Sequence, residues 1–250
     1  LTDIDMIAVG DVVVVRHAFN RAESSLQVLC ELVGGGLQRR AVERREERGN
    51  ADHGGDADIV VVNTCAFIES AKKEAIDNIL DVAWLKENSS LQAIIVTGCL
   101  AERYRDDIIG EMPEVDAVVG IGKNGEIVRI VNTALGGDKI CEYGEKEALC
   151  IDAPRLVSTP KYTAYLKIAE GCDNCCTYCA IPAIRGRFRS RKIESIVAEA
   201  KTLAQNGVKE IILVAQDTTK YGADIYGRSM LAALMKEIAK IDGIEWIRTL

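Results

Sequence analysis

Four cysteines lie within eight positions of the stretch EGCDNCCTYCAIP, which runs from Glu170 to Pro182. Three of them, Cys172, Cys176 and Cys179, form the pattern C-x-x-x-C-x-x-C. Three thiolates can hold three irons of a four-iron, four-sulfur cluster, which leaves the fourth iron open to a small molecule. Electron-carrying clusters usually have four cysteine ligands, so this pattern favours a catalytic cluster. The fourth cysteine of the stretch, Cys175, is interpreted as a bystander.

Two other interpretations of the cysteines stay open at this point. Pairing with Cys175 creates patterns that a zinc site could use, although neither histidine of the chain lies nearby to complete such a site. A purely structural group of thiols is the other alternative. A basic strip follows the cysteines and would either contact a substrate or face the solvent; it consists of Arg185, Arg187, Arg189, Arg191 and Lys192.

Composition limits the classes of protein that fit. The chain has 250 residues, 48% of them hydrophobic, and a net charge of −7, which argues against nucleic-acid binding through bulk charge. The sequence contains no apolar run of the roughly 18–20 residues that span a bilayer, and no signal peptide is recognised. We therefore expect a cytoplasmic, reducing setting without membrane contact, where clustered cysteines act as ligands more often than as disulfides.

Strands and helices are predicted to alternate in the first half of the chain. Continuous β-branched runs indicate strands buried on both faces, and apolar residues at helical spacing indicate helices between them. The predicted strands are 57–65, 91–99 and 115–122, and the predicted helices are 69–85, 101–112 and 125–135. This order is typical of βαβ units on a parallel sheet, so the fold class is α/β.

A second alternation follows an irregular, proline-containing segment. Its predicted strands are 163–171, 209–217 and 244–250, and its predicted helices are 193–207 and 229–242. We predict an N-terminal domain over 1–137, a linker over 138–162, and the first part of a (β/α) barrel over 163–250. Residues 1–56 are charged and irregular and are interpreted as divergent or unreliable. Because the chain opens on Leu1 and closes on a strand-like run, we expect a fragment of a longer protein.

The sequence around the cysteines, AYLKIAEGCDNCCTYCAIPAIRGRFRSR, resembles that of the methylthiotransferase branch of the radical S-adenosylmethionine (SAM) enzymes. The resemblance implies that Tyr178 lies near the adenine of SAM. The motif QDTTKYG, at the end of the second barrel strand, resembles the bacterial branch that modifies ribosomal protein S-twelve. Since that end of a barrel strand faces the active site, Gln216 and Asp217 are expected to contact SAM or substrate.

The first domain also resembles this family, in NTCAFIESAKKEAI and VTGCLAERY. The family's domain holds a second cluster on three cysteines, and Cys65 and Cys99 match two of them. Each is the last residue of a predicted buried strand, at the side of the sheet where α/β folds bind ligands. The third position is occupied by His17 in HAFNRAES, at 65 − 17 = 48 residues before Cys65, whereas Cys30 has a better spacing in the wrong motif. Histidine replaces cysteine on iron in some clusters, so both residues stay candidates.

The resemblance implies an enzyme with two 4Fe-4S clusters, one binding SAM at its open iron and one auxiliary. The implied reaction inserts a methylthio group at the β-carbon of an aspartate in ribosomal protein S-twelve, with a reducing electron donor as a further partner. Direct nucleic-acid binding is not expected. The alternatives are a tRNA methylthiotransferase of the same family and a non-catalytic iron–sulfur electron-transfer module. Because part of the barrel is missing, we expect the 250-residue chain to be inactive alone.

Overall fold

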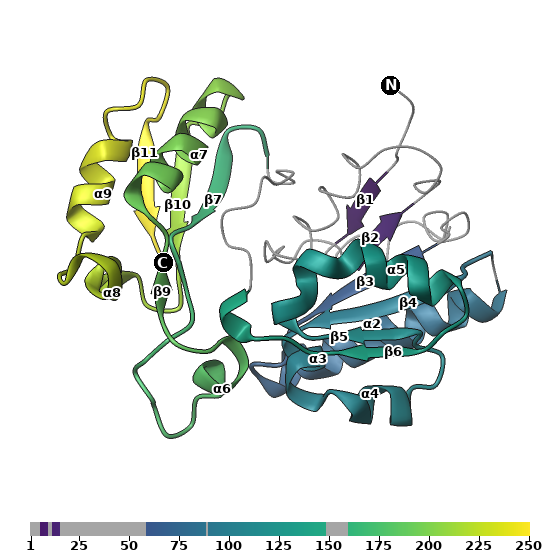
Figure 1. The fold of residues 1–250 in the computed structure, drawn as a ribbon. Coiled ribbons are helices and arrows are strands. Elements are labelled where there is room, and N and C mark those ends of the chain that lie inside the picture. The colour runs from purple at the N-terminus through teal and green to yellow at the C-terminus, as the bar shows by residue number, and fades with distance from the viewer. Residues whose placement is uncertain (1–5, 10–11, 16–58, 89, 149–159) are drawn as a thin grey trace. The chain divides into compact units, whose positions relative to one another are not determined.

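The chain divides into two compact units, Leu1–Leu156 and Val157–Leu250. The structure is a computed structural model that describes residues 6–9, 12–15, 59–88, 90–148 and 160–250 (Figure 1). The boundary between the units falls inside the segment 138–162, which the sequence predicts as a linker.

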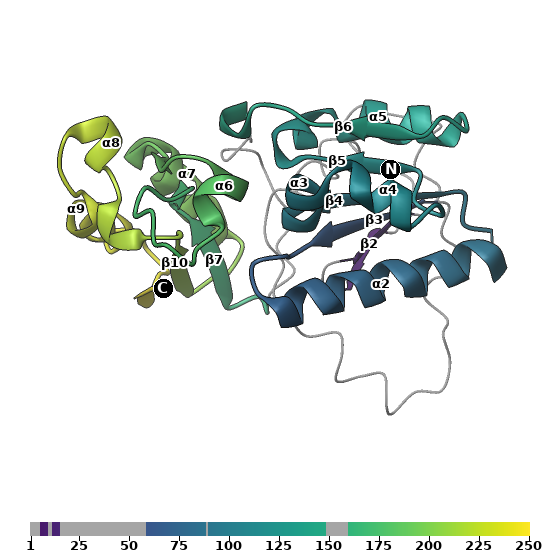
Figure 2. The same ribbon diagram turned by 90° about the horizontal axis from the view of Figure 1, so that it is seen from below.

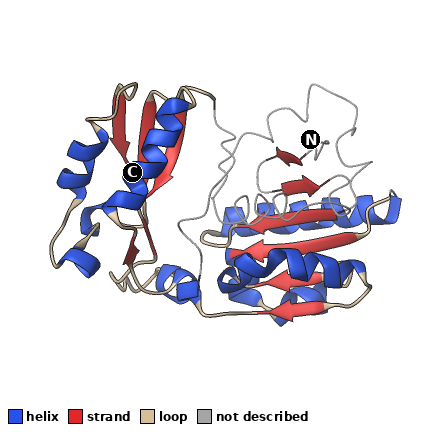
Figure 3. Ribbon diagram, turned by 45° about the horizontal axis from the view of Figure 1, so that its top comes forward, coloured by secondary structure: helices blue, strands red, loops and turns tan. Residues whose placement is uncertain are grey.

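The first unit is built on one six-stranded sheet with strands in chain order (Figure 3). Its strands are β1 (Met6–Val9), β2 (Val12–Val15), β3 (Ile59–Thr64), β4 (Ala93–Gly98), β5 (Ala117–Val119) and β6 (Ile140–Glu142). The strands β3 to β6 pair in parallel, which confirms the predicted α/β class. The strands β1 and β2 add an antiparallel edge that the sequence pattern does not predict. Strand β6 is also absent from the sequence prediction, which assigns its residues to the linker. Its three residues are too few to show a period.

Helices cover both faces of this sheet. They are α2 (Glu69–Asn88), α3 (Cys99–Tyr104), α4 (Asp106–Glu111) and α5 (Ile127–Leu135), the last preceded by the 3-10 helix η2 (Ile121–Glu126). Figure 1 shows α5 on one face and α3 and α4 on the other, and Figure 2 shows α2 running along the sheet beside β3. Alternate strand residues such as Ile59, Val61 and Ile95 pack against α5. Burial on both faces explains why the strands are continuous apolar runs.

The prediction of a single helix over 101–112 is wrong, because the helix is interrupted at Arg105. This residue has φ of 46°, a left-handed backbone that an α-helix cannot contain. The Arg105 side chain returns to the preceding turn, where Nη2 donates to Glu102 Oε1 at 3.1 Å. Glu102 is 4% exposed, and its other carboxylate oxygen accepts from the Ile121 amide at 3.1 Å. A buried carboxylate that joins two segments therefore stabilises the break.

The second unit has a three-stranded parallel sheet in the order β11-β10-β7. Its strands are β7 (Thr163–Lys167), β10 (Glu210–Val214) and β11 (Trp246–Thr249), with the short antiparallel pair β8 (Ala169–Glu170) and β9 (Arg189–Ser190) beside them. Its helices are α6 (Ile181–Arg185), α7 (Ile193–Gln205), α8 (Ala223–Tyr226) and α9 (Leu231–Ile238), with the 3-10 helix η4 (Thr218–Lys220) after β10. Another 3-10 helix, η3 (Lys146–Ala148), belongs to the first unit. The strand–helix alternation agrees with the predicted start of a (β/α) barrel, although the strand predicted over 163–171 is split between β7 and β8.

Replacing Tyr221 with phenylalanine is expected to lower the free energy of unfolding by about 1 kcal/mol. The Tyr221 side chain is fully buried in the core of the second unit, and its hydroxyl donates to the Arg191 carbonyl at 2.9 Å. The loss leaves that carbonyl without this donor. Chemical denaturation measures the change, with Tyr162→Phe as the control because Tyr162 is exposed. Equal stability of the two variants would contradict the assigned role of the buried hydroxyl.

Candidate metal centres

The cysteine loop, residues 171–180, connects β8 to α6 and contains neither helix nor strand. It begins at Gly171, which has φ of 78° and whose backbone lies so close to Arg187 that an added Cβ would stand 2.1 Å from the Arg187 carbonyl oxygen. Only glycine satisfies both conditions. The Cys172 amide donates to the Gly186 carbonyl at 3.2 Å. The strand end and the segment after α6 together fix the start of the loop.

The four thiols of the loop differ in exposure. The Cys172 residue is buried, at 8% exposed, Cys179 is half-buried, and Cys175 and Cys176 are exposed. A turn joins Cys176 and Cys179, whose amide donates to the Cys176 carbonyl at 3.0 Å. None of the four forms a disulfide. Cys175 has φ of 50°, which is uncommon for a residue with a side chain and sets it apart from the other three.

The donor set of this loop fits an iron–sulfur cluster. The described part of the chain holds no group of three or more His, Cys, Asp or Glu side chains placed to bind one metal ion. A four-iron cluster does not need such convergence, because each thiolate binds a different iron. The chemistry of the loop's donors is also uniform: they are soft thiols, with no imidazole among them. Thiols also bind zinc, so the donor type alone does not separate the two; the lack of a single-ion grouping among the described residues agrees with a cluster better than with a zinc site.

Two polar residues of the loop, Asp173 and Asn174, bond to residues outside it. Asp173 Oδ1 accepts from the Phe188 amide at 3.2 Å. The Asn174 side chain donates to Asp217 Oδ2 at 2.9 Å and accepts from Lys220 Nζ. Asp217, predicted from sequence as a contact to SAM or substrate, thus lies directly beside the cysteine loop.

The predicted contact residue Gln216 is held by a buried carboxylate. Its Nε2 donates to Glu170 Oε1 at 3.0 Å, and Glu170 is 0% exposed. Burial acts to raise the pKa of Glu170, but the charges of Lys167 and Arg185 outweigh it and lower that pKa below its usual range. The Lys167 ammonium lies 2.7 Å from Glu170 Oε2, and the Arg185 guanidinium lies 3.4 Å from Oε1. Sequence reasoning missed Glu170, although a lone acidic residue directly before Gly-Cys was a visible signal.

The remaining predicted residue of this unit, Tyr178, is 88% exposed between two of the cysteines. An aromatic ring so exposed contributes little to the core, and its contact with the adenine of SAM stays a prediction.

The basic strip does not form a continuous positive surface. Arg191 is 4% exposed and forms an ion pair of 2.7 Å with Glu199. Arg185 pairs with Glu170, and the Arg189 guanidinium donates to the Arg187 carbonyl at 2.9 Å. Most of these side chains therefore stabilise the fold around the loop, an outcome that neither reading of the strip anticipated.

In the first unit, Cys65 and Cys99 directly follow the neighbouring parallel strands β3 and β4. The last pair in their register is Thr64 with Gly98, so the two cysteines lie side by side at one edge of the sheet. The Thr64 hydroxyl joins the strand ends: it donates to the Thr97 carbonyl at 2.5 Å and accepts from the Leu100 amide at 3.1 Å. Cys99 is buried and Cys65 is half-buried. The candidates for the third position, His17 and Cys30, lie outside the described residues.

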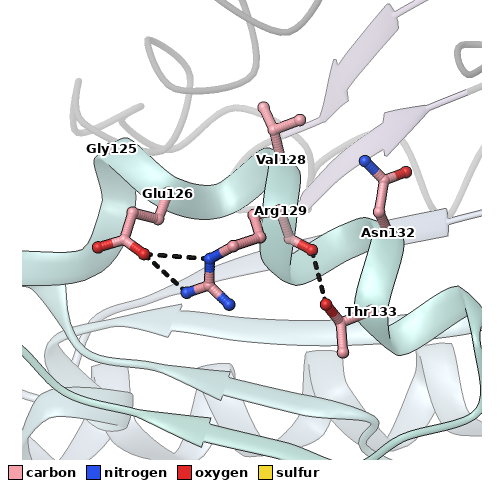
Figure 4. A pocket seen from close by; sticks show the side chains of 6 residues that line it. All are labelled: Gly125, Glu126, Val128, Arg129, Asn132 and Thr133. Carbon is pink, nitrogen blue, oxygen red and sulfur yellow. Dashed lines mark hydrogen bonds and ion pairs between the residues drawn. The ribbon is translucent and has the colours of Figure 1, made fainter.

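A shallow hollow on η2 and α5 has no such chemistry (Figure 4). Its charged residues pair with one another: Arg129 Nη2 lies 2.7 Å from Glu126 Oε2, and the Thr133 hydroxyl donates to the Arg129 carbonyl at 3.0 Å. No cysteine lines it.

Comparison with known proteins gives two family matches. Residues 37–120 match the uncharacterized protein family UPF0004, and residues 166–249 match the radical SAM superfamily. The second match contains Cys172, Cys176 and Cys179, and membership of this superfamily implies a 4Fe-4S cluster and SAM. The first match begins after both His17 and Cys30. The chain therefore carries a segment that matches UPF0004 followed by one that matches the radical SAM superfamily.

Individual relatives narrow the class. The chain is 52% identical over 196 residues to the ribosomal protein uS12 methylthiotransferase RimO of Clostridioides difficile (strain 630). It is 54% identical over 197 residues to the protein of the same name from Desulforamulus reducens. Over 78% of its length the chain is thus similar to RimO-like radical SAM methylthiotransferases, which confirms the resemblance inferred from its motifs. Each alignment covers 78% of the chain, which spans 44% of the length of either relative.

A solved radical SAM methyltransferase, TsrM from Kitasatospora setae, matches with a TM-score of 0.49 at 14% identity, over 78% of this chain and 42% of the other. That similarity is too weak to support a conclusion. In the described part of the chain, no helix is both long and apolar enough to cross a membrane.

Proposed function

We propose that Cys172, Cys176 and Cys179 hold a 4Fe-4S cluster whose fourth iron binds SAM. The proposal is supported by the three thiols on one loop, by the match of residues 166–249 to the radical SAM superfamily, and by the separate backbone conformation of Cys175. When bound, the reduced cluster supplies the electron that cleaves SAM. An electron donor is therefore a required partner.

The residues around this loop are assigned to positioning SAM. The Gln216 amide donates to Glu170, which turns its carbonyl oxygen away from that carboxylate and leaves it able to accept from a ligand. The exposed Tyr178 ring is assigned to the adenine. Because Glu170 is buried and ionised between Lys167 and Arg185, it fixes the Gln216 amide in one orientation.

A second, auxiliary cluster is assigned to Cys65 and Cys99 at the edge of the first sheet. The register of β3 and β4 places them together, and the Thr64 hydroxyl holds the two strand ends. The third ligand is assigned to His17 or Cys30, of which histidine is the harder donor. The UPF0004 match over residues 37–120 contains both Cys65 and Cys99 and supports an auxiliary cluster in this unit.

The reaction we assign is addition of a methylthio group to the β-carbon of an aspartate in ribosomal protein uS12, which places the enzyme in the cytoplasm. The single observation that supports uS12 as the substrate is the 52–54% identity to uS12 methylthiotransferases across 78% of the chain. The motif QDTTKYG follows β10 and contains η4.

A competition assay tests the substrate. The assay uses a protein in which this chain is extended to the full length of its relatives. This protein is incubated with uS12 and unmodified tRNA together with SAM and a reductant. We expect a mass increase of one methylthio group on a uS12 peptide and none on tRNA. Modification of tRNA alone would contradict the assignment, and the variant lacking Cys172 serves as the inactive control.

A further inference from the structure

We propose that Asn174, Asp217 and Lys220 form a polar latch that holds the cysteine loop in its ligand-binding conformation before any cluster is present. The proposal rests on the proposed role of Cys172, Cys176 and Cys179 as ligands. It assigns Asn174 and Lys220 as positioning residues, and it gives Asp217 a role in shaping the loop.

The latch uses both polar ends of one amide. Asn174 Nδ2 donates to Asp217 Oδ2 at 2.9 Å, while Asn174 Oδ1 accepts from Lys220 Nζ. The two partners lie 43 and 46 residues further along the chain, so the contacts join the cysteine loop to the segment after β10. A side chain that only donates or only accepts cannot replace both bonds.

The far side of the latch is itself rigid. Asp217 Oδ1 accepts from the Thr219 amide at 3.1 Å and from the Thr219 hydroxyl at 2.6 Å, which caps η4. The hydrogen bond from Thr219, followed by that from Asn174, lowers the pKa of Asp217 below its usual range. The carboxylate is therefore fixed in place by η4 before it accepts from Asn174.

The cysteine loop needs such support because its own backbone offers little. Between residues 172 and 179, its described backbone–backbone bonds are those of Cys172 to Gly186 and of Cys179 to Cys176, with the positive φ of Cys175 between them. Asp173 ties one side of the loop to the Phe188 amide, and the latch ties the other side to η4. Holding the loop in advance reduces the conformational entropy that cluster binding must otherwise overcome.

Two substitutions in the 250-residue chain test the latch, Asn174→Ala and Lys220→Met. The first readout is hydrogen–deuterium exchange of loop amides in the metal-free protein. The second is the rate at which iron is lost to a chelator from the anaerobically reconstituted protein. We expect each rate to rise about tenfold, since each substitution removes one or two hydrogen bonds that involve a charged group. Lys220→Arg keeps a cationic donor and is expected to stay close to wild type in both readouts.

Matched controls separate the latch from general destabilisation. Asn206→Ala and Lys236→Met remove exposed side chains of the same types from the same unit, and neither is expected to change either rate. The proposal is overturned if loop exchange or iron loss in the latch variants equals that of the controls. Failure of the proposed function gives a different result from failure of the latch alone, because the wild-type chain would then take up no iron at the cysteine loop. That result would overturn the latch as well.

Discussion

Replacing Cys172 with alanine is expected to remove about four irons from the reconstituted chain, leaving about four of about eight. Cys172 is the buried member of the three thiols, at 8% exposed, and its amide is bonded to Gly186. Its loss removes a ligand that the other two thiolates cannot replace from their turn. Iron and acid-labile sulfide content after anaerobic reconstitution measures the effect.

The matched control is Cys175→Ala, which removes the neighbouring thiol of the same loop. This variant is expected to keep the wild-type iron content, because Cys175 is exposed and has a left-handed backbone unlike the other three. Iron loss in Cys175→Ala with full retention in Cys172→Ala would exchange their roles and refute the ligand set. A wild-type content of about four would instead show that the Cys65 and Cys99 site is incomplete.

Replacing Glu170 with alanine is expected to destabilise the second unit by about 3 kcal/mol in the metal-free chain. Removing one partner of a buried ion pair costs about 3–5 kcal/mol. We take the low end because Lys167 and Arg185 keep 24% and 22% of their side chains exposed. The loss also removes the acceptor for Gln216 Nε2. Hydrogen exchange of core amides in β7 and β10 reports this unit alone.

The control is Glu245→Ala, which removes an exposed carboxylate paired with Lys209 at 2.7 Å in the same unit. An exposed ion pair contributes about 0–1 kcal/mol, so exchange in the core strands is expected to change little. If the amides of β7 and β10 exchange at the same rate in Glu170→Ala and Glu245→Ala, the buried ion pairs of Glu170 do not stabilise the second unit as predicted.

Much of the fold follows from periodicity. The runs that became β3 and β4 begin with four consecutive apolar residues, β7 and β10 are mostly apolar with alternate residues buried, and the helices between them carry apolar residues at helical spacing. The misses have physical causes. Arg105 breaks a helix through a backbone conformation held by Glu102, 3 residues away in sequence but fixed by burial against Ile121. Such tertiary contacts leave no mark on local propensity.

The candidate site was likewise predictable from the sequence only in part. Cysteine spacing identified Cys172, Cys176 and Cys179, and strand ends pointed to Cys65 and Cys99. The contacts of Asn174 and Glu170 with residues about 45 positions away could not be predicted, because polar side chains carry no periodic signal. Only the folded register brings the cysteine loop and the end of β10 together.

The central claim, an open iron that binds SAM, is tested most directly by electron paramagnetic resonance of the reduced, reconstituted chain with and without SAM. We expect SAM to change the spectrum of the cluster held by Cys172, Cys176 and Cys179. The change is expected to be absent in Cys172→Ala and present in Cys175→Ala. A spectrum that is identical with and without SAM would contradict the claim and would favour an electron-carrying iron–sulfur module.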